Sequence, residues 1–210
     1  MFTSIGVGRL LLLAGIAAGV LFFIVPSVEI FRRPGFDIER HAISMLSLGS
    51  GGWRMKTVFF VSGLLTLLCA LGVHRAATGW PAFVGALLIG AFGVGLILAG
   101  LFDAPAGLGF PQGTPHDQAP TMTPGAVVHS IAFMVAFSGL IASCFAFTPH
   151  FLFAQQPVWA GVSAAVGMAL PTLIALGMSS TMAPGVAFYW AAMLGWLWLG
   201  VTVTKLLPVA

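Results

Sequence analysis

The side chains of this sequence that could bind a metal or move a proton are few, and five of them fall near the ends of long apolar segments. They are His41, Ser44, Asp103, His116 and His129. Imidazole nitrogens and carboxylate oxygens are natural zinc ligands, and a catalytic zinc ion takes three protein ligands and one water molecule. The three histidines of this group, together with Asp103, therefore form a candidate zinc-binding set.

The same group also offers chemistry without a metal. The carboxylate of Asp103 could orient His129, which would then act as a general base on Ser44 or on a lipid group; these three residues would be catalytic. Alternatively, His41, Ser44, Asp103 and His129 would bind a ligand through hydrogen bonds alone. A structural interpretation is also open, in which Asp103 ends a helix, His129 bonds to a neighbouring helix and His116 is solvated. No HExxH, HxxxH or CxxC spacing selects among these interpretations.

The elements that must position these residues are membrane-spanning helices. Of the 210 residues, 59% are hydrophobic and only 6% are charged, which is too little polar surface for a soluble domain. The apolar runs are continuous rather than alternating, and lipid forces each segment to satisfy its own backbone hydrogen bonds. We predict an all-α polytopic membrane protein, with one six-helix transmembrane domain over residues 1–210. The predicted spans are about 7–25, 57–74, 81–101, 125–147, 157–177 and 185–204.

An even number of spans places both termini on one side of the membrane and the two long loops on the other. The terminal side carries Arg9, Arg75 and Lys205 and no acidic residue. On the loop side, five positive and five negative side chains cancel. The count of Lys and Arg alone favours a cytoplasmic loop side, but that rule weakens for long loops. We expect cytoplasmic termini.

The first long loop, about residues 26–56, is predicted to contain a short helix lying in the membrane interface. Pro34 and Gly35 break the chain early, and a glycine-rich stretch at 49–52 breaks it late. Between them, residues 37–48 have mixed polarity, and Asp37 is a plausible N-cap. On such a helix His41 and Ser44 would share a face, because they are three residues apart.

The second long loop, about residues 102–124, contains five prolines, which exclude regular helix or strand. Two interpretations are equally consistent with it: a stiffened lid over the mouth of the bundle, or a solvated connector. The predicted third span is rich in small residues, which allow neighbouring helices to approach closely. Its glycines are Gly85, Gly90, Gly93, Gly95 and Gly100.

Two other ligand classes are weighed and set aside. His74 and His150 lie on the terminal side and could in principle hold haem, but their places at helix ends favour simple exposure. We therefore do not expect haem. No basic tract is present that would bind nucleic acid.

Several ordered features resemble a known family. The stretch 41–49 reads HAISMLSLG, Gly93-x-Gly95 precedes the stretch AGLFD at 99–103, and His129 follows a proline-rich loop. This order resembles the family called domain of unknown function 998, which comprises six-helix integral membrane proteins of bacteria and archaea. The resemblance implies a place in a bacterial or archaeal cytoplasmic membrane and signature positions at 44–49, Asp103 and His129. Met45 departs from the family, in which an acidic residue often follows the serine.

Three functions follow from these observations, because the family has no established activity. The first is an integral membrane protein whose polar cluster on the loop side binds a lipid headgroup, a small ligand or a partner subunit, including a second copy of the chain. The second is a membrane-embedded hydrolase, with or without zinc, acting on an amphiphilic substrate. The third is a transporter, which is less favoured because the second, fifth and sixth spans carry only Ser, Thr and Pro as polar or irregular residues at mid-depth.

Overall fold

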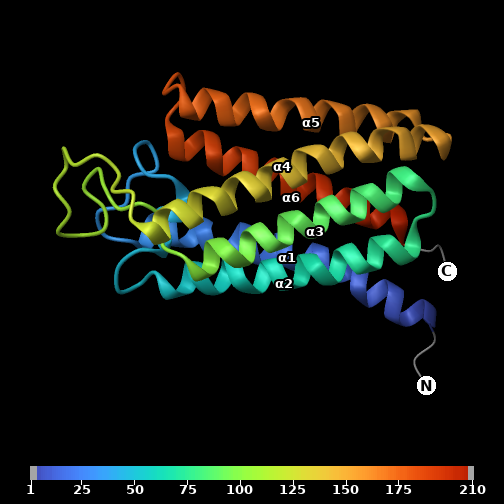
Figure 1. The fold of residues 1–210 in the computed structure, drawn as a ribbon, viewed down its shortest axis with the longest axis horizontal. Helices are drawn as coiled ribbons and strands as arrows, with labels where there is room; N and C mark the ends of the chain where they lie inside the picture. Colours follow the sequence, from blue (N-terminus) through green and yellow to red (C-terminus); the bar gives the residue numbers. More distant parts are fainter. Residues whose placement is uncertain (1–3, 208–210) are drawn as a thin grey trace.

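Helices account for most of the computed structural model, which describes residues 4–207 (Figure 1). They are α1 Ser4–Arg32, α2 Trp53–Ala76, α3 Trp80–Leu101, α4 Pro124–Phe153, α5 Pro157–Met178 and α6 Pro184–Leu206, with a short 3₁₀-helix, η1, at Ile43–Ser47. Each of the six α-helices is long and apolar enough to cross a membrane. The prediction of an all-α, six-helix membrane bundle is confirmed. The start of α1 and the end of α6 lie at the same end of the bundle, opposite the long loops (Figure 1).

Two helices extend well beyond the predicted spans. The structure continues α1 to Arg32 and α4 to Phe153, whereas the apolar runs end near 25 and 147. Prolines lie inside both helices, Pro26 in α1 and Pro149 in α4. A proline removes one backbone donor, but membrane helices tolerate it where neighbouring groups satisfy the freed carbonyl. Proline is therefore a poor marker of a helix end in this chain.

Small residues set the packing of α3 against its neighbours. A Cβ atom on Gly93 would lie 2.9 Å from the carbonyl oxygen of Gly63 in α2, and one on Gly95 would lie 2.7 Å from that of Ala132 in α4. Such distances leave no room for any side chain. The expected close packing is confirmed at these two glycines; a Cβ on Gly90 would make only an ordinary contact, 3.9 Å from the Ala70 methyl. The ring of helices closes where α1 packs against α6.

The two long loops fold together into one extramembrane unit, which we call the cap (residues 33–52 and 102–123). Its own apolar cluster contains Phe110, which is buried between the loops. Arg33 holds the first loop in shape, since its guanidinium donates to the carbonyls of Leu46 and Leu48 and stacks over the Phe110 ring, 5.4 Å from its centre. Burial lowers the pKa of the Arg33 guanidinium and the nearby Glu29 carboxylate raises it, but such a group stays charged at neutral pH. The second loop is therefore packed against the first and is not merely a solvated connector.

The short helix predicted in the first loop is present as the 3₁₀-helix η1 at Ile43–Ser47, and the first part of the predicted range 37–48 is a turn. The Asp37 side chain accepts a hydrogen bond from the Glu39 N–H at 2.9 Å, and the Asp37 carbonyl accepts from the N–H of Arg40 and of His41. The Asp37 N–H in turn donates to Nδ1 of His41 at 2.9 Å. The two bonds that involve side chains, at Asp37 Oδ1 and at His41 Nδ1, offer the backbone an alternative to a continuous helix. His41 and Ser44 consequently do not share a helical face.

Candidate functional site: a cavity beside His129

The ring of His41 is a structural link inside the cap. Its Nδ1 accepts from Asp37, so its Nε2 carries the hydrogen and donates to the carbonyl of Leu108 at 2.9 Å. The side chain is 2% exposed and packs against Phe36 and Phe110. Both ring nitrogens are thus engaged, and a metal or ligand would have to displace one of these bonds.

Asp103 and His116 lie apart from the buried histidines. The Asp103 carboxylate forms an ion pair with Lys56 at 2.6 Å, and its side chain is 55% exposed. His116 is exposed, and its backbone carbonyl accepts a hydrogen bond from Arg40 across the cap. Within residues 4–207, no three His, Cys, Asp or Glu side chains are grouped so that they could hold a metal ion. The predicted zinc set is therefore not assembled in the described part of the chain.

His129 is held by the end of α3. Its Nδ1 lies 2.9 Å from the carbonyl oxygen of Phe102, the residue that caps α3. Carbonyls at a helix C-terminus lack partners within the helix, so the imidazole supplies the missing donor. The sequence suggests Asp103 as the group that orients the ring, whereas in the structure the hydrogen bond to the ring is made by the carbonyl of the preceding residue, Phe102. His129 itself is 4% exposed and packs edge-on against Phe59.

This contact also determines where the imidazole hydrogen sits. A carbonyl oxygen can only accept, so Nδ1 of His129 must carry the hydrogen. In the neutral ring, Nε2 is then a lone-pair acceptor. His129 therefore offers an acceptor or a base to whatever occupies the space beside it.

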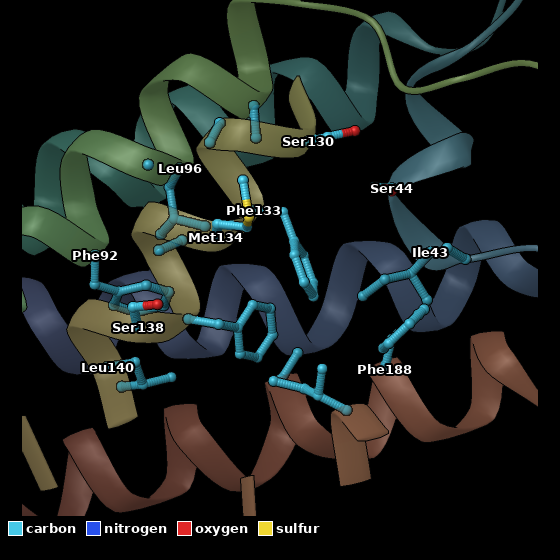
Figure 2. Close-up of a pocket in the computed structure, with 18 of the residues that line it drawn as sticks. Ile43, Ser44, Phe92, Leu96, Ser130, Phe133, Met134, Ser138, Leu140 and Phe188 are labelled. Carbon is cyan, nitrogen blue, oxygen red and sulfur yellow. The ribbon is translucent and has the colours of Figure 1, made fainter. Parts of the chain in front are cut away.

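That space is a cavity of about 650 Å³, which is within the usual size range of small-molecule sites. It lies between the first half of α4, the last part of α5 and the facing segments of α3 and α6, with η1 at its cap end. Figure 2 shows Ser44 and Ser130 toward the cap and Leu140 at the other end. The walls are mostly apolar, and no charged side chain of the described residues lines them.

The polar side chains that line the cavity are few, and most of them lie near the cap. They are Ser44, His129, Ser130, Ser138 and Trp196. The Ser130 hydroxyl donates to the Ala126 carbonyl at 2.9 Å, which leaves its oxygen able to accept. The structure therefore brings Ser44 and His129 to one cavity and leaves His41, Asp103 and His116 outside its lining.

The mouth of the cavity opens sideways between α4 and α5. The exposed lining residues all belong to these two helices, and they are Met134, Ser138, Pro171, Ala175 and Met178. The two helices diverge toward the cap (Figure 1). The same side of the bundle is apolar, with Met134 56% and Met178 73% exposed. In a membrane this mouth faces lipid chains rather than water.

The structure buries one carboxylate that the sequence places among the ordinary loop charges. Glu29, near the end of α1, is 2% exposed, and its Oε1 lies 3.5 Å from Nη1 of Arg54. Its Oε2 has no hydrogen-bond partner among the described residues. Buried charges need a partner, so this pair fastens the start of α2 to α1. Only the position of Glu29, four residues beyond the predicted span 7–25, could have signalled its burial, and that position points equally to a solvated loop.

The apolar bundle, the packed cap and the cavity open toward lipid define a multi-pass integral membrane protein. The chain belongs to the family described as protein of unknown function (DUF998), whose model matches residues 16–205. The match runs from the first half of α1 to the end of α6, so the family resemblance predicted from short motifs is confirmed. No curated protein and no solved structure matches the chain.

Proposed function

We propose that the protein binds an amphiphilic molecule of the membrane in the cavity beside His129. The apolar chain of this molecule occupies the space between α3, α4, α5 and α6, and its polar group lies at the cap end near Ser44 and His129. One observation carries the proposal: an apolar cavity, whose exposed lining residues lie on the apolar helices α4 and α5, has a hydrogen-bonding end. A water-soluble ligand would find neither an aqueous route through this mouth nor many polar partners within.

The depth of the cavity matches one leaflet of a bilayer. On α4 the lining runs from His129 to Ile141, and twelve steps at a rise of 1.5 Å span about 18 Å. The hydrocarbon core is about 30 Å thick, so one leaflet is about half of that. A lipid of the cap-side leaflet could therefore move sideways through the mouth while its polar group stayed at the membrane surface.

We also propose that the termini are cytoplasmic and that the cap lies outside a bacterial or archaeal cytoplasmic membrane. In support of this, four cations of the cap side are held by specific partners. Arg33 binds backbone carbonyls, Arg40 binds the His116 carbonyl, Arg54 pairs with Glu29 and Lys56 pairs with Asp103. Five acidic side chains also neutralise this side, while the terminal side has three cations and no acid.

Photolabelling tests the proposed function. A lipid probe with a photoactivatable group in its alkyl chain is added to the purified full chain in nanodiscs, and labelled peptides are identified by mass spectrometry. Labelling is expected on α4, α5 and α6 within the cavity. The variant Ala175→Trp narrows the mouth at an exposed position, and it should lower cavity labelling severalfold.

A matched control lies on the same helix. Ala165 of α5 is also exposed but does not line the cavity, so Ala165→Trp adds the same bulk elsewhere. The control should label as the unmodified protein does. Equal labelling of the two tryptophan variants and the unmodified chain would show that probes bind only the outer surface, and the proposed function would fall.

Hydrolysis of the bound molecule is the second candidate. It is favoured by one observation, that Ser44 and His129 line the same cavity, since a hydroxyl and an imidazole base are the parts of a nucleophilic mechanism. To test this, the protein is incubated with a carboxylic ester that has the same alkyl chain as the lipid probe, and the released acid is measured. A hydrolase would release acid in the unmodified chain and lose that release in Ser44→Ala, with binding retained.

A further inference from the structure

We propose that the ligand is an uncharged lipid alcohol, whose hydroxyl donates a hydrogen bond to Nε2 of His129. This inference rests on the proposed function and names its ligand class. A long-chain alcohol and an acylglycerol with a free hydroxyl both belong to the class; a phospholipid, a fatty acid and a lipid with only ester or ether oxygens do not.

The first argument is the direction of the hydrogen bond. Nδ1 of His129 is committed to the Phe102 carbonyl, so the neutral ring presents a lone pair at Nε2. The complementary group must be a donor. An ester carbonyl or an ether oxygen has only lone pairs to offer, and it could bind only if the ring gained a second proton. A charged imidazolium, 4% exposed among apolar walls, is costly.

The second argument is the absence of charge. No Lys, Arg, Asp or Glu side chain among the described residues lines the cavity. Four of the five cations on the cap side are held by other groups, as when Lys56 pairs with Asp103 at 2.6 Å and Arg33 binds the Leu46 carbonyl. A phosphate or carboxylate drawn to His129 would thus lose water without gaining an ionic partner. The same holds for a choline or ammonium group.

The third argument is that the neighbouring hydroxyls complete the fit. A ligand hydroxyl that donates to Nε2 of His129 still has lone pairs, which need a donor. Ser44 is half-buried and lines the cavity, and its hydroxyl can donate. Ser130 has given its hydrogen to the Ala126 carbonyl, so its oxygen is a second acceptor for a diol. In Figure 2 both serines lie at the cap end, away from Leu140.

The polar group of the ligand must determine which lipids the cavity selects. An alkyl chain that leaves the bilayer for an apolar cavity gains little from the hydrophobic effect, because lipid tails are as apolar as the cavity walls. A hydroxyl can donate a hydrogen bond to Nε2 of His129 and its methyl ether cannot, which distinguishes the two ligands by about tenfold in affinity. Chain length alone would not produce such a difference.

The test compares photoactivatable probes with one identical alkyl chain and different ends. The ends are a primary alcohol, its methyl ether, a carboxylate and a phosphate monoester. Each probe is added to the purified full chain in nanodiscs, and cavity labelling is measured as a function of probe concentration. The alcohol is expected to label at concentrations about tenfold lower than the ether, the carboxylate and the phosphate. This comparison needs no variant, so it remains decisive if a substitution at His129 fails to fold.

A variant then locates the preference. In His129→Asn the side-chain amide can still donate to the Phe102 carbonyl, because its nitrogen reaches the position of Nδ1, but nothing replaces Nε2. The alcohol should then lose its advantage over the ether. A preference that persists in His129→Asn would overturn the role of His129.

The remaining outcomes separate the two proposals. Equal labelling by all four probes, still blocked by Ala175→Trp, would overturn the lipid-alcohol class and leave the proposed function standing. Preferred labelling by the phosphate or the carboxylate would overturn the class in favour of an anionic lipid. Labelling that Ala175→Trp does not reduce for any probe would remove the proposed function, and this inference with it.

Discussion

The imidazole of His129 donates to the backbone carbonyl of Phe102 at 2.9 Å, and this bond joins the first turns of α4 to the end of α3. The adjacent Asp103 turns away to the surface and pairs with Lys56. Adjacent residues therefore have different roles: Phe102 accepts the hydrogen bond that orients the His129 ring, and Asp103 forms an exposed ion pair. The His129–Phe102 bond also leaves Nε2 as the acceptor at the polar end of the cavity.

Removing the donor should destabilise the bundle. In His129→Ala the half-buried Phe102 loses the donor to its carbonyl, and we expect a loss of about 1–3 kcal/mol in the free energy of unfolding. His129→Asn keeps a donor in place and should lose clearly less. Thermal unfolding of the detergent-purified variants, followed by circular dichroism, measures both. Equal losses in the two variants would mean that the hydrogen bond contributes little and that the volume of the ring matters instead.

Asp103 should be dispensable for ligand binding. Its ion pair with Lys56 is exposed, and such pairs contribute only about 0–1 kcal/mol. We expect Asp103→Asn to retain the stability and the probe labelling of the unmodified chain, while His129→Asn loses the preference for the alcohol. A loss of the alcohol preference in Asp103→Asn as large as that in His129→Asn would show that the carboxylate belongs to the site.

Gly185 should tolerate no side chain, because α6 begins against the first loop of the cap. A Cβ atom there would overlap the carbonyl oxygens of His41 and Ile38. Gly185→Ala should therefore displace this turn, with a cost of about 1–3 kcal/mol and faster proteolysis of the cap. Gly161→Ala on α5 is the control, since nothing lies within 4 Å of its Cβ position. The control should be neutral or slightly stabilising, because alanine is the better helix former. Similar behaviour of the two variants would argue against the contact.

The orientation of the chain can be read by labelling single cysteines in intact cells. The native Cys69 and Cys144 are buried, so they give little background. Gln112→Cys in the cap should react with a membrane-impermeant maleimide from outside, and Thr78→Cys between α2 and α3 should react only after permeabilisation. The opposite pattern would place the cap in the cytoplasm.

The features of the fold that follow from local composition were predictable. Lipid leaves the backbone no alternative to helix, so the apolar runs predicted the six spans, and the glycines of α3 predicted its close packing. His129 stood out for a similar reason, since a polar side chain one turn inside an apolar span must find a partner. Its actual partner is the backbone carbonyl of Phe102. Every residue has a backbone carbonyl, so the residue types do not indicate which one accepts the hydrogen bond.

The features that depend on tertiary packing were not predictable. The turn at Asp37 replaces a helix because His41 bonds both to Asp37 and to Leu108 in the other loop. The cavity is volume that side chains leave unfilled, and no residue type announces it. In the sequence, Ser130 and Ala175 are ordinary helix residues. Only the three-dimensional arrangement of α4 and α5 shows that both line the cavity.

Mass spectrometry of the lipids that the purified protein retains tests the central claim most directly. The unmodified chain and the variants Ala175→Trp and Ala165→Trp are purified in the same mild detergent, and bound lipids are measured per mole of protein. The account predicts about one tightly held neutral lipid with a free hydroxyl in the unmodified chain and in Ala165→Trp, and its loss in Ala175→Trp. The same lipids in the same amounts in all three proteins would contradict occupation of the cavity.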